Sequence, residues 1–136
     1  MKTTIFLLFC FLSFAASRAQ VPDLTGTWTM FEMTYKTNEG VEIMSEDQMK
    51  SNGSVTDFIF MEEGKFKQTS NMSGSGTMDT YEGTWKLMEN ELVLSLNLNE
   101  RLIDIVWDVE FIENTMNLSR TNPTGTLTII NSFRRK

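Results

Sequence analysis

Apolar and polar residues alternate along most of the chain after residue 24, which is the pattern of strands that bury one face. The segment 101–113 shows it most clearly, with acidic residues on one side and five apolar residues on the other: Ile103, Ile105, Trp107, Val109 and Phe111. Seven further segments have strand character: 24–36, 55–61, 66–72, 77–88, 91–98, 115–120 and 126–133. The pattern therefore predicts eight strands in sequence order.

Two strand-like segments carry local irregularities. In the first, Trp28 and Met30 share one face, whereas Phe31 and Met33 share the other. A change of parity within a strand indicates a β-bulge or kink, or a strand that is covered on both sides. In segment 77–88, Gly83 indicates a bulge or a close approach of a neighbouring backbone.

The strand pattern stops between Asn38 and Gly53, where one stretch has helical signals. Ser45 and Gln48 are spaced as a capping box, acidic residues occupy the first turn, and Lys50 lies in the last turn. We expect one short helix over residues 46–51.

Consecutive strands joined mostly by short turns favour an antiparallel up-and-down arrangement, and closing that sheet removes both of its edges. Eight strands give a barrel that side chains can fill or that can hold one small ligand. The sequence thus predicts an all-β protein, an eight-stranded antiparallel up-and-down barrel with one short helix after the first strand. A two-sheet sandwich is the structural alternative.

The first residues are typical of a secretory signal peptide. Lys2 is followed by an apolar run over residues 5–14 and then by small residues, with a favourable cleavage point between Ala19 and Gln20. The run is shorter than the roughly 20 residues that cross a bilayer, so we expect no stable membrane insertion after cleavage. We therefore assign residues 1–19 to a signal peptide and residues 20–136 to one secreted or periplasmic domain.

Composition excludes several classes of function. The chain contains no histidine, and its single cysteine, Cys10, lies in the predicted signal peptide, so the usual zinc ligands and Ser-His or Cys-His pairs are missing. Cleavage removes Lys2 and Arg18 and no acidic residue, which changes the formal net charge from −6 to −8. A charge of this sign disfavours nucleic acids and anionic lipid surfaces.

A short motif and a basic tail suggest a family. Gly26-Thr27-Trp28 opens the first strand, and Arg134 and Arg135 follow the last one. With eight predicted strands, the chain resembles the small secreted lipocalin-like proteins of the calycin superfamily. In that family the tryptophan of a Gly-x-Trp motif closes the base of the barrel against an arginine near the end of the last strand. The resemblance implies that Gly26 and Trp28 close the barrel with Arg134 or its neighbour Arg135, and we take Arg134 first.

Five residues are candidates to bind a ligand inside the barrel. Asp79, Tyr81 and Trp85 share one face of their strand, and Trp107 and Arg120 lie on later strands. Polar groups among apolar side chains set the orientation of a bound molecule. The alternatives are core packing for the tryptophans and solvent exposure for the polar residues near strand ends. Four methionines, whose thioethers adapt to irregular cavities, are further candidates: Met30, Met33, Met61 and Met78.

We therefore expect an exported, non-enzymatic protein that binds a small, largely apolar molecule or lipid in the barrel. The alternative is a filled barrel that acts as a structural or protein-interaction module at the cell surface. Asp104, Asp108 and Glu110 face away from the apolar side of their strand and are expected in solvent rather than at a catalytic centre. We expect no cofactor, metal or nucleic-acid partner, and the sequence identifies no protein partner.

Overall fold

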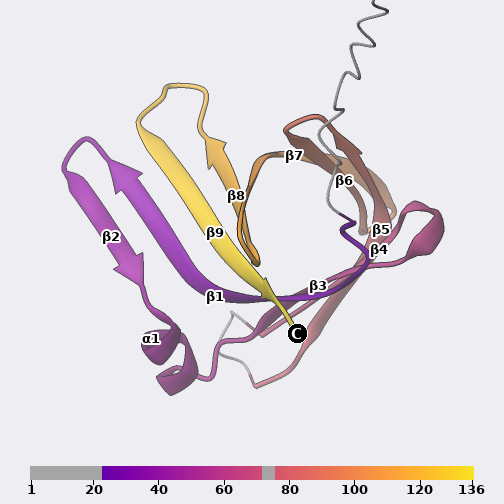
Figure 1. Cartoon of the computed structure of the whole chain (residues 1–136), viewed down its shortest axis with the longest axis horizontal. Coiled ribbons are helices and arrows are strands. Elements are labelled where there is room, and N and C mark those ends of the chain that lie inside the picture. Colours follow the sequence, from indigo (N-terminus) through magenta and orange to yellow (C-terminus); the bar gives the residue numbers. More distant parts are fainter. Residues whose placement is uncertain (1–22, 72–75) are drawn as a thin grey trace, which may run out of the picture.

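The computed structural model describes residues 23–71 and 76–136. Its strands form one antiparallel sheet that curves into a barrel (Figure 1). In chain order the elements are β1 (Gly26–Thr37), β2 (Gly40–Met44), α1 (Glu46–Ser51), β3 (Thr56–Phe60), the 3₁₀ turn η1 (Glu62–Gly64), β4 (Lys65–Ser70), β5 (Asp79–Met88), β6 (Glu91–Leu98), β7 (Arg101–Ile112), β8 (Thr115–Thr121) and β9 (Leu127–Arg135). The predicted signal peptide lies outside the described residues.

The barrel closes because β1 pairs on both of its sides. Its first residues, 26–29, pair with β3, and residues 28–37 pair with β9. From β3 to β9 each strand pairs with the next, and every pairing is antiparallel. The predicted eight-stranded antiparallel up-and-down barrel, of lipocalin-like type, is confirmed, and the sandwich is excluded.

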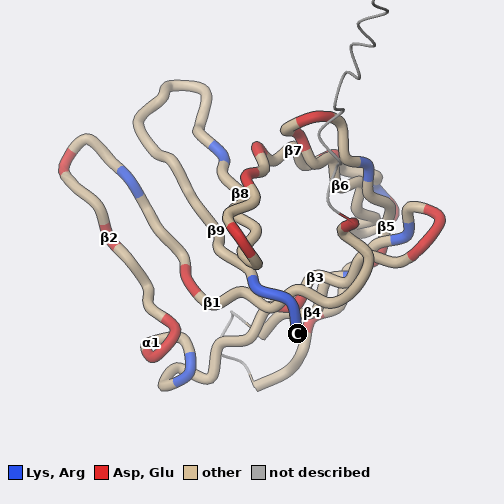
Figure 2. Tube along the Cα trace, viewed as in Figure 1, with Lys and Arg blue, Asp and Glu red and all other residues tan. Residues whose placement is uncertain are grey.

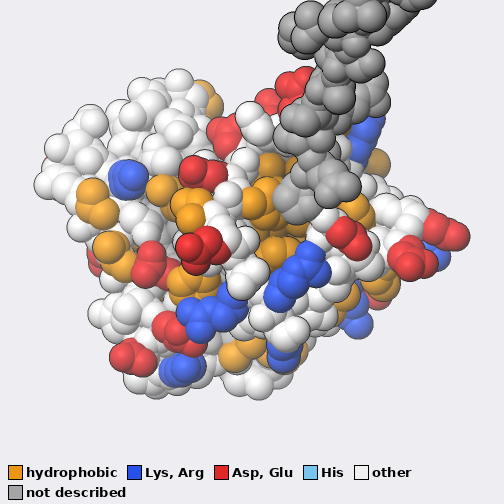
Figure 3. Space-filling model, in the orientation of Figure 1, with side chains coloured by type: hydrophobic (Ala, Val, Ile, Leu, Met, Phe, Trp, Pro, Cys, Tyr) orange, Lys and Arg blue, Asp and Glu red, His pale blue; other side chains and the backbone are white. Residues whose placement is uncertain are grey.

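β2 is a strand that the sequence pattern did not predict. It pairs with the second half of β1 and forms a hairpin that extends beside the barrel (Figure 1). Its apolar residues, Val41 and Ile43, are 61% and 51% exposed, and hydrophobic side chains lie on the surface over this hairpin (Figure 3). The expectation that the strand pattern stops after Asn38 is therefore wrong for this segment. β2 is held by its backbone pairing with β1, because its side chains bury little apolar surface.

The predicted helix is confirmed as α1. The Ser45 side chain accepts a hydrogen bond from the Gln48 N–H at 3.3 Å, and the Gln48 side chain accepts one from the Ser45 N–H at 2.9 Å. This reciprocal pair is the capping box that the sequence indicated. Met49 anchors the helix in the core and is 2% exposed. In the described parts of the chain, no helix has the length and apolar character needed to span a membrane.

The parity change in β1 is a β-bulge. The register between β1 and β9 shifts between Met30 and Glu32, and Phe31 has no partner in that register. The extra residue returns Met33 to the inner face of the barrel, so that it lines the interior with Met30. Phe31 is left on the outer face.

One half of the barrel interior is filled by aromatic side chains. Phe58 lies 5.2 Å from Phe66 and 4.5 Å from Phe133, and Phe60 lies 5.2 Å from Phe66, measured between ring centroids. All four are at most 4% exposed. Gly83 lies directly across from Phe66, and a Cβ atom there would collide with the carbonyl group of Ser95 on β6. The close approach predicted at Gly83 is therefore confirmed.

Candidate functional site

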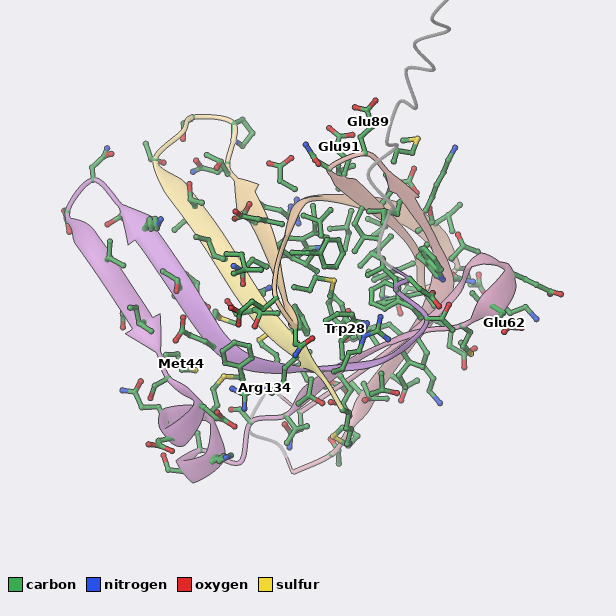
Figure 4. The ribbon with its side chains drawn as sticks, in the orientation of Figure 1. Trp28, Met44, Glu62, Glu89, Glu91 and Arg134 are labelled. Atoms are coloured by element: carbon green, nitrogen blue, oxygen red, sulfur yellow. The ribbon has the colours of Figure 1, made fainter. Side chains whose placement is uncertain are left out.

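The filled end of the barrel is sealed by Trp28 and Arg135. The Trp28 Nε1–H donates to the Leu24 carbonyl at 3.0 Å. The Arg135 guanidinium carbon lies 4.6 Å from the centroid of the Trp28 ring, and the same group donates to the carbonyl oxygens of Thr25, at 2.9 Å, and Asp23. Figure 4 shows Trp28 within the ring of strands. These contacts join the start of β1 to the end of β9.

Arg135, rather than Arg134, is the partner of Trp28, so the prediction of Arg134 is wrong. The physical reason is the register, in which Trp28 lies opposite Arg135 and therefore shares its face of the sheet. Arg134 points to the other face (Figure 4). There its guanidinium carbon lies 4.2 Å from the centroid of the Phe31 ring, and one of its guanidinium nitrogens lies 3.1 Å from a Glu46 carboxylate oxygen. The basic end of β9 lies beside β1 in Figure 2.

Gly26 lies beside this closure in a backbone conformation that favours glycine. It has a φ of +129°, which favours glycine, and a Cβ atom added there would lie 3.4 Å from an Arg135 guanidinium nitrogen. The structure thus places Gly26 and Trp28 at the sealed end, where the resemblance put them.

The other half of the barrel contains a cavity of about 370 Å³. One wall comes from β3, β4 and β5, whose residues lie side by side in two rows. Thr56, Ser70 and Asp79 form the row farther from the sealed end. The Thr56 and Ser70 hydroxyls lie 3.0 Å apart, within hydrogen-bond distance. This row makes the wall polar.

The second row lies closer to the sealed end. It contains Phe58, Gln68 and Tyr81. This row borders the aromatic layer, to which Phe58 belongs. The neighbouring strands β6 and β7 contribute apolar side chains, including Leu94 and Ile105, which face each other in register. The cavity therefore has one polar and one apolar wall.

Two polar atoms of the cavity lining are buried without a hydrogen-bond partner among the described residues. They are the Trp107 Nε1, a donor, and the Asn131 Oδ1, an acceptor. Asn131 is 7% exposed. A buried polar group that stays unpaired costs about 1–3 kcal/mol, and most such groups in native proteins have a partner.

The structure brings three of the five predicted ligand-binding residues to this cavity: Asp79, Tyr81 and Trp107. Trp85 is not among the lining residues, because it lies farther along β5 than Gly83, beside the aromatic layer. Its Nε1–H donates to the Met61 carbonyl at 3.0 Å, and its ring packs edge-on against Phe60 at 5.5 Å. The structure thus gives Trp85 a packing role, in contrast to the prediction.

Arg120 lies outside the main cavity, which also corrects the prediction. Its guanidinium carbon is 5.3 Å from the centroid of the Trp107 ring. It lines a second pocket of about 390 Å³ together with residues that include Pro123 and Leu127 of the β8–β9 hairpin. Trp107 belongs to both linings, so its ring is a shared wall.

Sequence reasoning missed four polar lining residues: Thr56, Gln68, Ser70 and Asn131. A signal for one of them was present, because Asn131 interrupts the inward alternation of Ile129 and Phe133 with a polar side chain. Among the candidate methionines, Met30 and Met33 line the cavity. Met61 and Met78 are exposed at the surface.

The two carboxyl groups with perturbed acidity lie away from the cavity. The Thr25 backbone N–H lowers the pKa of Asp23, with a smaller contribution from Arg135. A hydrogen bond from Lys50 lowers the pKa of Glu46, and the charge of Arg134 acts in the same direction. Over residues 23–71 and 76–136, no group of three or more His, Cys, Asp or Glu side chains is placed to hold a metal ion.

The closed eight-stranded barrel, sealed at one end by the Gly-x-Trp tryptophan and the last strand's arginine, defines a lipocalin-like domain. No protein-family model and no curated protein matches the chain. Among solved structures, a lipocalin-like protein from Bacteroides uniformis ATCC 8492 is similar with a TM-score of 0.54 at 17% identity, over 85% of this chain and 100% of that chain. An uncharacterized protein from Bacteroides eggerthii DSM 20697 is similar with a TM-score of 0.52 at 18% identity, over 84% of this chain and 100% of that chain. These similarities concern the fold alone.

Proposed function

We propose that this chain is an exported, non-enzymatic binding protein whose barrel cavity holds a small, largely apolar molecule. The cavity volume of about 370 Å³ falls within the ~300–1,000 Å³ typical of small-molecule sites. Its apolar wall provides affinity, and its polar wall sets orientation. The observation that carries the proposal is the cavity itself, which opens between the polar row of Thr56 and Ser70 and the apolar side chains of Leu94 and Ile105.

A non-enzymatic role is supported by what faces the cavity. Asp79 is its one lining carboxylate, and the chain has no histidine to act as a base. Asp104, on the outer face of β7, accepts a hydrogen bond from Ser95, and Asp108 and Glu110 are exposed on the same face. General acid–base chemistry therefore lacks its usual pair of groups in the cavity.

Export rests on the predicted signal peptide. We expect the exported protein to begin at Gln20, which an intact-mass measurement on protein from its natural host would show. A secreted form that retains residues 1–19 would contradict this part of the proposal.

Binding can be tested with 1-aminoanthracene, an uncharged dye whose emission rises in apolar surroundings. The cavity predicts saturable binding that Ile105→Trp blocks, because Ile105 lines the cavity and an indole there takes up its volume. Val106→Trp is the matched control, since Val106 is the next residue on β7 but is 46% exposed and lies outside the cavity. Urea unfolding would show that both variants are folded. Equal dye binding by both variants, or none by the unaltered protein, would contradict the proposal.

The filled-barrel alternative has less support. It requires an interior occupied by side chains from end to end, and the described residues fill only the half around Phe60 and Phe66. The exposed apolar residues of β2 remain a surface feature, with nothing in the structure to identify what covers them.

A further inference from the structure

We infer that Phe58 limits how deeply a ligand enters the barrel, and that the cavity therefore selects compact apolar molecules over long-chain ones. This inference rests on the proposed function and specifies the class of molecule that the cavity holds. Of the four phenylalanines in the aromatic layer, Phe58 is the one that also lines the cavity.

The position of Phe58 between the two halves of the barrel is the first argument. On β3 it lies between Thr56, which belongs to the polar row, and Phe60, which lies closer to the sealed end. The cavity lining includes Thr56 and Phe58 but not Phe60. It also stops short of Phe66 and Phe133, whose ring centroids lie 5.2 and 4.5 Å from that of Phe58. The Phe58 ring therefore separates the cavity from the rings that fill the sealed end.

Neighbouring rings hold Phe58 in this position. Its side chain is buried, and it meets Phe66 edge-on with an interplanar angle of 88°. Phe133 packs against it at an angle of 35°, and the Phe60 centroid lies 6.3 Å away on the same strand. A ring that is packed on several sides at the density of a protein interior has little room to turn aside. A ligand therefore meets Phe58 as a fixed floor.

The size of the cavity is the second argument. Its volume of about 370 Å³ is near the lower end of the ~300–1,000 Å³ that is typical of small-molecule sites. The affinity of an apolar ligand grows with the apolar surface that it buries, here against side chains such as Leu94 and Ile105. Once a chain reaches Phe58, further carbons stay outside the cavity and bury little surface. Length beyond that point adds little to the affinity.

A series of 1-alkanols from hexanol to dodecanol tests the inference on the unaltered protein, in competition with 1-aminoanthracene. While added carbons are buried, the affinity should rise about fourfold with each methylene group. We expect it to stop rising within the series, at a limiting chain length set by Phe58. A rise that continues at the same rate to dodecanol would overturn the inference and leave the proposed function intact. If neither the dye nor any alkanol binds, the proposed function itself is contradicted.

Variants of β3 attribute the limiting chain length to Phe58. Phe58→Ala leaves a space below the floor, so the limiting chain length should increase by about two carbons or more. Phe60→Ala is the matched control, because Phe60 lies on the same face of β3 and is equally buried but does not line the cavity. It should leave the limiting chain length unchanged, and urea unfolding would show how far each variant is destabilised.

A milder variant covers the case in which Phe58→Ala does not fold. Phe58→Leu keeps an apolar side chain and should increase the limiting chain length by about one carbon, since it removes less of the floor. An unchanged limiting chain length in the folded Phe58 variants would overturn the inference. An equal increase in Phe60→Ala would do the same, because a general loosening of the aromatic layer would then explain the result.

Discussion

Gly83 shows at the scale of one residue how the barrel restricts its sequence. Its place between Phe66 and Leu96 in neighbouring strands leaves no space for a side chain. We expect Gly83→Ala to lower the free energy of unfolding by about 3 kcal/mol, at the upper end of overpacking effects, because the obstacle is backbone of β6 rather than a flexible side chain. Urea unfolding measures the change. A loss below about 0.5 kcal/mol, similar to that of Thr84→Ala at the exposed neighbouring position, would contradict the close approach.

Arg134 and Arg135 provide a second test at the scale of one residue, because replacing either one removes the same charge. Arg135→Ala should cost about 1–2 kcal/mol of unfolding free energy, because it removes hydrogen bonds to the Thr25 and Asp23 carbonyls and a cation–π contact with Trp28. Arg134→Ala should cost less than about 1 kcal/mol, since its ion pair with Glu46 is at the surface. The same urea titration compares them. The reverse order would contradict the assignment of Arg135 as the residue that seals the barrel.

At the scale of elements, α1 depends on its cap. Ser45→Ala should lower the unfolding free energy by about 1 kcal/mol, because the Gln48 N–H would lose its acceptor in a helix too short to be stable alone. Ser51→Ala, in the last turn, should change it by less than about 0.5 kcal/mol, as surface substitutions usually do. Chemical denaturation of the two variants makes the comparison, and equal effects would show that the cap does not matter.

The attachment of α1 to β9 should depend on pH. Lys50 and Arg134 lower the pKa of Glu46, so the folded state gains stability from this carboxylate above its ordinary pKa of 4.5 and loses it as the pH falls through the lowered value. The stability difference between the unaltered protein and Glu46→Gln should therefore be largest at neutral pH and shrink near pH 3. Urea midpoints at the two pH values measure it. Glu82→Gln is the control, as an exposed acid without an ion pair among the described residues.

The elements also show what sequence reasoning could and could not recover. The parity change in β1 indicated a bulge or kink, or a strand covered on both sides, and the structure shows the bulge. Capping chemistry was enough for α1, because that signal is local. β2 was missed because its alternation is only three residues long, from Val41 to Ile43, and both apolar side chains stay exposed. The choice between Arg134 and Arg135 required the register of β9 against β1, which fixes the face that each arginine occupies.

The whole molecule combines a filled half and a hollow half, and that division was not predictable from one sequence. Strand count and length gave the closed barrel. Whether its interior was open depended on which side chains form rows across several strands, as Thr56, Ser70 and Asp79 do. Asn131 was missed for the same reason, because one sequence does not show which strand residues line the cavity.

Ligand binding should be visible in the stability of the whole barrel. A ligand that binds only the folded state at 100 times its Kd adds about 2.7 kcal/mol to the unfolding free energy. We expect 1-aminoanthracene to raise the thermal midpoint of the unaltered protein and to leave that of Ile105→Trp unchanged. Thermal scans with and without 1-aminoanthracene measure the effect. An equal rise in both proteins would place the binding outside the cavity.

Native mass spectrometry of the exported protein, purified from its natural host without detergent, tests the central claim most directly. The account predicts a reproducible added mass that is released on denaturation and that belongs to a small molecule with a largely apolar body. A bare protein mass, together with no binding of 1-aminoanthracene, would contradict the claim that the barrel holds a ligand.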